Sequence, residues 1–212
     1  HWVVSLPSTQ AWEFGPSSGA MNDRDNNLAL MLDNPLFRTQ YERAVLDAMQ
    51  QAGIPAGSDV VLTGFSQGGI MAANLAADSS FPYNPIGVVT NGSPVDNFHV
   101  PPNVPVYAFQ HATDVVPMLD GSLVGVPGLP GQSPFDIPNS PVTVLPPNIH
   151  QITLPDPDGA HGFGAHNNPK YATSVAEWEA AYRDANGGTD PWDLAGLGGT
   201  VVDHQVYQGV ER

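Results

Sequence analysis

Residues 59–70 read DVVLTGFSQGGI, and this stretch decides the fold of the chain. The apolar run at 59–65 predicts a central strand of a parallel sheet. Residues 67–77 (QGGIMAANLAA) predict a helix that begins directly after that strand. Between the two lies a G-x-S-x-G motif centred on Ser66, in the strand–turn–helix context that a serine nucleophile requires.

A sharp turn from strand to helix would hold Ser66 in a strained backbone conformation, with its hydroxyl exposed above the sheet. Side chains in place of Gly64 and Gly68 would collide in such a turn, which explains a glycine on each side. The backbone N–H of Gln67 would lie at the start of the helix, where the helix dipole favours developing negative charge. The alternative is an ordinary glycine-rich turn, which the adjacent Gly69 leaves open.

Strands and helices alternate on both sides of this motif. Further strands are predicted at 2–6, 86–91, 104–110 and 149–154. Further helices are predicted, from their apolar faces and terminal Asn, Pro and Gly residues, at 35–52 and 169–185. The run at 2–6 is apolar and β-branched, so we expect a buried strand, and 201–207 is a candidate edge strand. The alternation predicts an α/β fold over 1–212, with a mostly parallel central sheet flanked by helices in a single domain.

A serine hydroxyl becomes a nucleophile only beside a base that is itself oriented by an acid. In this topology the chain order is Ser, then Asp or Glu, then His, on loops that follow later strands. Asp114 closely follows a predicted strand, with Asp96 and Asp120 as alternative acids. The loop after the next predicted strand holds His161 and His166, which spacing alone hardly separates; we favour His166 as the base and keep His161 as the alternative. Both loops leave the carboxyl ends of their strands, where open α/β sheets place their sites.

An oxyanion hole needs a second backbone N–H besides that of Gln67, and it should come from the loop after the first strand. Pro7 has no N–H, so the donor is one of the next three residues, Ser8, Thr9 or Gln10. We choose Thr9 as this second donor.

The histidines outside the expected site are predicted to be surface or structural residues: His1, His99, His111, His150 and His204.

Composition excludes several classes of protein. The chain of 212 residues has 6 Lys and Arg against 21 Asp and Glu, a net charge of −15, so we expect no nucleic-acid partner. It has no cysteine, hence no disulfide or thiolate metal site, and no run of 18 apolar residues that could span a membrane. The stretch 23–27 (DRDNN) resembles the start of a calcium loop, but Leu28 and Asn34 stand where such a loop has Gly and Glu. No nucleotide-binding glycine motif follows a strand. We therefore expect neither a metal nor a cofactor.

Two segments lack any periodic pattern. Residues 8–33 are rich in Ser, Gly, Asn and Asp and are predicted to be a long loop. Of the 22 prolines, 11 lie between 101 and 147, and we expect 120–147 to be a lid or surface excursion. Its apolar residues would line an acyl pocket or form a small satellite core.

The chain begins at His1 with a strand-like run, from which we expect an extracellular protein or a processed piece of a longer chain.

With this order of Ser, Asp and His, the sequence resembles the α/β-hydrolase superfamily. More narrowly, it is similar to actinobacterial hydrolases related to cutinases and lipases, over three stretches: VLTGFSQGGIMAANLAAD (61–78), VVTNGSPVDNFHVPPNVPVYAFQHATDVVPMLDG (88–121) and AHNNPKYATSV (165–175). The resemblance implies Ser66 as nucleophile, Asp114 as acid and His166 as base. The chain departs from the family at Ser8, where the family has the glycine of a P-G-T oxyanion turn.

These patterns predict a cofactor-independent serine hydrolase that acts on carboxylic esters, including lipid or other acyl esters, through an acyl-enzyme. The string G-F-S-Q-G-G also occurs in carboxylesterases and acyl-protein thioesterases, so it does not define the substrate. Two other classes stay open: a non-catalytic hydrolase-fold binding module of a larger assembly, and an acyltransferase or thioesterase. The sequence does not determine the oligomeric state.

Overall fold

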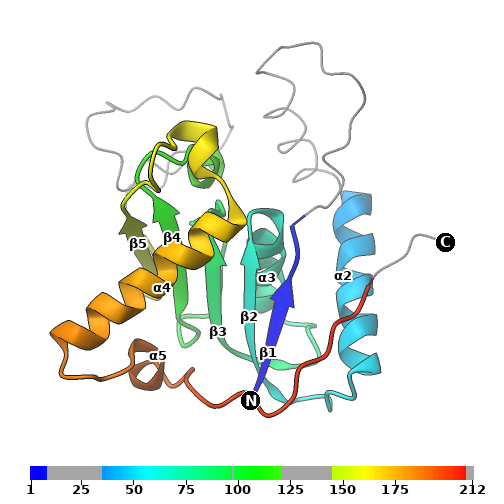
Figure 1. Ribbon diagram of the computed structural model, residues 1–212. Coiled ribbons are helices and arrows are strands. Elements are labelled where there is room, and N and C mark those ends of the chain that lie inside the picture. The colour runs from blue at the N-terminus through cyan, green and yellow to red at the C-terminus, as the bar shows by residue number, and fades with distance from the viewer. Residues whose placement is uncertain (9–34, 97, 121–144, 209–212) are drawn as a thin grey trace.

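The computed structural model describes residues 1–8, 35–96, 98–120 and 145–208. Within these ranges, five strands form one parallel sheet in which neighbouring strands follow each other in chain order (Figure 1). The strands are β1 (Trp2–Leu6), β2 (Asp59–Phe65), β3 (Asn84–Asn91), β4 (Val106–His111) and β5 (Ile149–Leu154). The predicted α/β class and parallel sheet are confirmed, and each strand end lies within two residues of its prediction.

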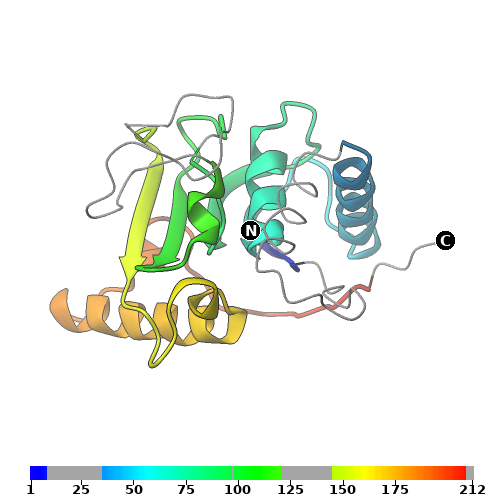
Figure 2. The same ribbon diagram turned by 90° about the horizontal axis from the view of Figure 1, so that it is seen from above.

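Helices cover both faces of the sheet. The helices α2 (Pro35–Gln51) and α3 (Gln67–Ala77) lie on one face, and α4 (Asn168–Ala185) crosses the other, as the view from above shows (Figure 2). The remaining short elements are α5 (Pro191–Leu194) and the 3₁₀ helices η1 (Val116–Asp120) and η2 (Gly162–Ala165). Parallel strands need this cover because both of their faces are apolar.

Side chains alternate between the two faces along each strand. Val88 packs in a larger cluster with residues of α2 and α3, whereas its neighbour Val89 packs in a smaller cluster with residues of α4. The larger cluster includes Val45, Met49, Val60, Leu62, Met71, Leu75, Val106 and Ile149. The smaller cluster is rich in aromatic residues and includes Phe65, Tyr107, Phe109, Tyr171, Trp178 and Trp192. Both faces of the central strands are therefore buried, which explains their continuous apolar runs.

The start of α4 matters most for the site, because the loop before it carries the two candidate bases. Asn167 caps this helix: its side-chain oxygen accepts the backbone N–H of Lys170 at 3.1 Å. Pro169 occupies the first turn, where a missing N–H has no consequence. The predicted Asn-Pro start is therefore correct to within one residue.

Two expectations about strands are wrong. Among the described strands, β1 lies at the edge of the sheet beside β2, and only Leu6 of its residues is buried, while Val3 is 60% exposed. An apolar, β-branched run fits an edge strand as well as a central one, so composition could not separate them. Residues 201–207 form no strand, and Val202 is 95% exposed. A segment rich in β-branched residues becomes a strand only beside a neighbour that offers backbone partners.

Most of the two aperiodic segments, 8–33 and 120–147, lies outside the described residues, as do Thr9 and Gln10. The expected loop and the expected lid therefore stay predictions. In the part of the chain that the structure covers, no helix has both the length and the apolar character needed to cross a membrane.

Candidate active site

Ser66 occupies the turn between the end of β2 and the start of α3. Its φ is 53° and its ψ is −120°, and it is the one residue other than glycine with a positive φ among those described. Holding a side chain in such a region costs roughly 1–3 kcal/mol, so the surrounding structure must enforce it. The predicted strained turn is present, and the strain falls on the serine.

The flanking glycines are required by close backbone contacts. A Cβ on Gly64 would lie 2.3 Å from the carbonyl carbon of Gly68, as the motif predicts. A Cβ on Gly68 would instead lie 2.1 Å from the carbonyl oxygen of Leu6, at the end of β1. Gly69 is also constrained, because its Cβ would lie 2.1 Å from Ser93 Oγ. An ordinary glycine-rich turn would not need three glycines packed against three different segments.

His166 joins the nucleophile to the acid. Its Nε2 lies 3.0 Å from Ser66 Oγ and its Nδ1 lies 2.8 Å from Asp114 Oδ2. A carboxylate can only accept, so Nδ1 carries the proton in the neutral ring and Nε2 is left to accept the Ser66 hydroxyl proton. The structure thus brings together three side chains from the loops after β2, β4 and β5, at the carboxyl edge of the sheet.

Burial differs along this chain of hydrogen bonds. The side chain of Asp114 is 0% exposed and that of His166 is 10% exposed. Asp114 Oδ1 accepts the backbone N–H of Val116 at 3.0 Å, and Oδ2 accepts the Tyr171 hydroxyl at 2.7 Å in addition to His166. A buried carboxylate needs such donors because an unpaired charge in the interior is costly. Asp114, the acid that the sequence favoured, therefore lies beside the imidazole.

Tyr171 and His111 complete the packing around the acid, although no sequence motif predicted a role in the site for either of them. The Tyr171 hydroxyl accepts the backbone N–H of His111 at 2.9 Å, and the two rings stack with centroids 3.8 Å apart. Burial first, and then the charge of Asp114, raise the pKa of Tyr171 far above its ordinary value, so its hydroxyl stays a donor. The prediction that His111 is structural agrees with its buried, hydrogen-bonded ring.

Gly92 and Phe65 shape the space around the imidazole. A Cβ on Gly92 would lie 3.0 Å from Asp114 Oδ2 and 3.1 Å from His166 Cε1, and its φ of +59° also favours glycine. Phe65 stacks on the His166 ring. Two features of the sequence could have pointed to these residues. Gly92 directly follows a predicted strand, and Phe65 lies within the G-x-S-x-G motif.

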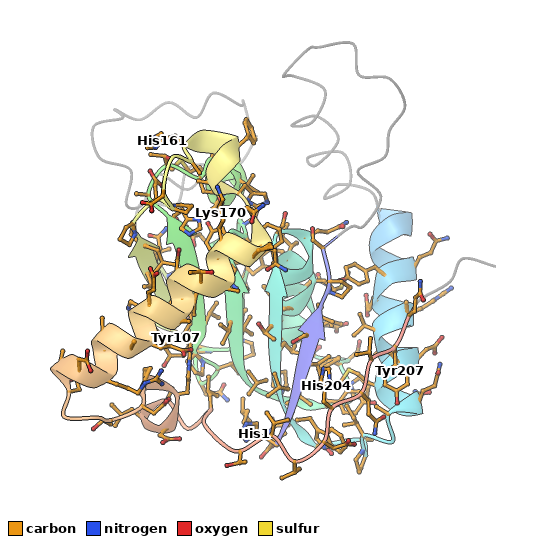
Figure 3. All side chains as sticks on the ribbon, in the orientation of Figure 1. His1, Tyr107, His161, Lys170, His204 and Tyr207 are labelled. Carbon is orange, nitrogen blue, oxygen red and sulfur yellow. The ribbon has the colours of Figure 1, made fainter. Side chains whose placement is uncertain are left out.

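His161, the alternative base, points into solvent near the top of the molecule (Figure 3). Its side chain is 77% exposed, and its Nδ1 lies 3.3 Å from Asp156 Oδ2. Asp156 also accepts the backbone N–H of Thr113 at 2.8 Å. Desolvation raises the pKa of Asp156, but the hydrogen bonds from Thr113 and His161 outweigh it and lower that pKa below its ordinary value. His161 therefore stabilises a loop beside the site, and its imidazole does not contact Ser66.

The backbone around the turn bears on the expected oxyanion hole. Gln67 is the first residue of α3, so its N–H belongs to the helical turn where the dipole favours negative charge. The loop after β1 begins against the same turn, because the carbonyl oxygens of Leu6 and Pro7 lie beside Gly68. The Tyr41 hydroxyl donates to the Pro7 carbonyl, and desolvation raises the pKa of Tyr41, which keeps that donor protonated.

Comparisons with known protein families, with curated proteins and with solved structures find no match to this chain. Within the described residues, no group of three or more His, Cys, Asp or Glu side chains is placed to hold a metal ion. A hydroxyl on a strained turn, an imidazole within hydrogen-bond reach and a buried carboxylate behind it are the parts of a nucleophile–base–acid relay.

Proposed function

We propose that this chain is a serine hydrolase of carboxylic esters, built on an α/β-hydrolase fold. The observation that carries the proposal is the continuous hydrogen-bonded chain from Ser66 through His166 to Asp114, with Ser66 on a strained turn. The chain order of nucleophile, acid and base along successive parallel strands supports the same fold.

In the proposed reaction, Ser66 Oγ attacks the ester carbonyl carbon while its proton passes to His166 Nε2. Asp114 holds the imidazole in the required tautomer and stabilises the imidazolium. When the tetrahedral intermediate collapses, His166 gives this proton to the leaving alkoxide, and the alcohol departs. Water then attacks the acyl-enzyme with the same assistance, which releases the carboxylic acid and restores Ser66.

The negative charge on the carbonyl oxygen requires backbone donors. We assign these to the N–H of Gln67, at the start of α3, and the N–H of Thr9, on the loop after β1. Each such donor is worth roughly 2.7–4 kcal/mol of transition-state stabilisation in comparable hydrolases. The acyl group would lie above the carboxyl edge of the sheet, and we propose lipid or other acyl esters as substrates.

The proposal is tested by labelling the protein with an alkylphosphonate ester and locating the adduct by mass spectrometry. We expect one adduct, on Ser66, and loss of both labelling and ester turnover in Ser66→Ala. Ser80→Ala, an exposed serine after α3, is the matched control and should label like the unaltered protein. A folded sample that neither labels nor turns over esters would reject the proposal and favour a non-catalytic binding module.

Labelling alone does not separate hydrolysis from acyl transfer, because both pass through the same acyl-enzyme. Product analysis with water and competing alcohols or thiols separates the two. We expect the free carboxylic acid as the main product. A dominant transfer product would retain the Ser66 chemistry and replace the hydrolase assignment with that of an acyltransferase.

A further inference from the structure

Tyr171 lies behind the proposed site, fully buried, and contacts the acid instead of the nucleophile. Its hydroxyl donates to Asp114 Oδ2 at 2.7 Å and accepts the backbone N–H of His111 at 2.9 Å. We propose that Tyr171 is a positioning residue, an inference that rests on the proposed function. Tyr171 fixes the carboxylate of Asp114 and sets how strongly that carboxylate attracts the imidazole of His166.

Two donors share one oxygen of the acid. Asp114 Oδ2 accepts both the Tyr171 hydroxyl and the Nδ1–H of His166, at 2.7 and 2.8 Å. Each hydrogen bond donated to an ionised oxygen reduces the negative charge that the oxygen offers to its other donors. A stronger bond from the phenol therefore weakens the attraction of the carboxylate for the imidazolium, and a weaker bond strengthens it.

The phenol suits this role because it stays protonated. The titratable side chains around it are the Asp114 carboxylate, the His111 imidazole stacked on its ring and the Asp156 carboxylate nearby. Burial first, and then the charge of Asp114, raise the pKa of Tyr171, and Asp156 adds to this effect. Tyr171 is thus a constant donor over the pH range in which the imidazole titrates.

His111 also fixes the position of the loop that carries His166. Its Nδ1 lies 2.8 Å from the carbonyl oxygen of Ala165, which can only accept, so Nδ1 donates and, in the neutral ring, Nε2 accepts the Ser174 hydroxyl at 3.0 Å. Ala165 directly precedes His166 in the chain, so β4 is tied to the loop that carries the base and, through Ser174, to α4. Replacing the phenol by a phenyl ring would leave the buried N–H of His111 without its acceptor as well as removing the bond to Asp114.

The first test follows the titration of His166 by NMR in protein labelled with ¹⁵N in its histidine rings, with the signal assigned by its absence in His166→Gln. In Tyr171→Phe we expect the midpoint to move to higher pH, by about 0.5 unit or more, since one unit corresponds to about 1.4 kcal/mol. Tyr182→Phe makes the same chemical change on the same helix, in contact with Trp178 instead of the site, and should leave the midpoint unchanged.

A second variant preserves the packing if Tyr171→Phe does not fold. Site-specific replacement of Tyr171 by 3-fluorotyrosine keeps both hydrogen bonds and makes the hydroxyl a stronger donor. The midpoint should then move to lower pH, opposite to the phenylalanine variant. If the midpoint stays unchanged in every folded variant, or moves in the opposite direction, the positioning role of Tyr171 is overturned.

Turnover of a soluble ester separates this inference from the proposed function. In Tyr171→Phe we expect kcat to fall about tenfold, with KM nearly unchanged and the acidic limb of the pH profile displaced to higher pH. Unaltered protein that shows no turnover or labelling, but whose titration responds to Tyr171 as described, would reject the enzyme and retain the positioning role. Active protein in which the His166 titration does not respond to substitution of Tyr171 would retain the enzyme and reject the positioning role.

Discussion

The ring of Phe65 stacks on the imidazole of His166, with centroids 4.6 Å apart and an angle of 30° between the planes. Phe65 immediately precedes Ser66 in the chain, so the residue beside the proposed nucleophile supports the base that would activate it. Phe65 also belongs to the aromatic cluster under α4, which fixes its own ring. A single segment of the chain thus places both partners of the proton transfer.

Phe65→Leu is expected to lower kcat about threefold to tenfold, because the aromatic pair is worth about 0.5–1.5 kcal/mol beyond its buried area. KM should change little, since Phe65 supports the base and we assign it no contact with substrate. The measurement is steady-state turnover of a soluble ester. Phe81→Leu, which removes a ring tilted against that of Tyr83 away from the site, is the control, and an equal loss of kcat in both variants would contradict the role of Phe65.

Gly69→Ala is expected to destabilise the protein by about 2 kcal/mol or more, because its Cβ would lie 2.1 Å from Ser93 Oγ. This clash is with a side chain, so Ser93→Gly should partly relieve it. We expect a coupling energy of at least about 1 kcal/mol between the two substitutions in denaturant unfolding. Gly64→Ala meets only backbone of Gly68 and Gly69, so Ser93→Gly should not rescue it. Additive effects of the Gly69 and Ser93 substitutions would refute the proposed contact.

The strained turn at Ser66 was predictable because its constraints are local. A strand, a serine between two glycines and a helix follow one another within one stretch, and the structure places all of them as predicted. The preference for Asp114 and His166 also agrees with the observed contacts. The preference for Asp114 rested on chain order, because the carboxyl ends of parallel strands meet at one edge of the sheet. Chain order did not separate His161 from His166, and the preference for His166 rested largely on the resemblance to the hydrolase family.

Features that depend on contacts between distant segments were not predictable in this way. The bond from Tyr171 to Asp114 joins α4 to the loop after β4, and in the sequence Tyr171 is only one member of an apolar helix face. The exposure of Val3 follows from the place of β1 at the sheet edge, which composition does not encode. Likewise, the choice between His161 and His166 depends on which loop residue points inward.

His166→Ala should lower kcat/KM by about 10⁴-fold or more, as the loss of a base does in comparable hydrolases. His161→Ala should stay within about twofold of the unaltered protein, because its exposed ring contacts Asp156 and not Ser66. In the unaltered protein and in His161→Ala, turnover should fall on acidification, since a protonated imidazole cannot accept the serine proton. Loss of turnover only in His161→Ala, or a flat profile from about pH 5 to 9, would contradict the assignment of the base.

Asp156→Asn tests the loop that joins Thr113 to His161. The pKa of Asp156 is lower in the folded protein than its ordinary value, so the folded state binds fewer protons than the unfolded state between those two pKa values. Its stabilising contribution is therefore complete above the ordinary pKa of about 4 and is lost as the pH falls through the lower, folded one. Because Asn can still accept the N–H of Thr113, the substitution isolates the effect of charge.

At pH 7 we expect Asp156→Asn to reduce the free energy of unfolding by up to about 1 kcal/mol. The difference from the unaltered protein should shrink below about pH 4, as the carboxyl groups of the unfolded and then the folded protein take up protons. Denaturant unfolding over a series of pH values measures it, with Asp158→Asn, an exposed aspartate of the same loop, as the control. A difference that stayed constant down to the lowest pH at which the protein folds would show that Asp156 acts through packing and not through its charge.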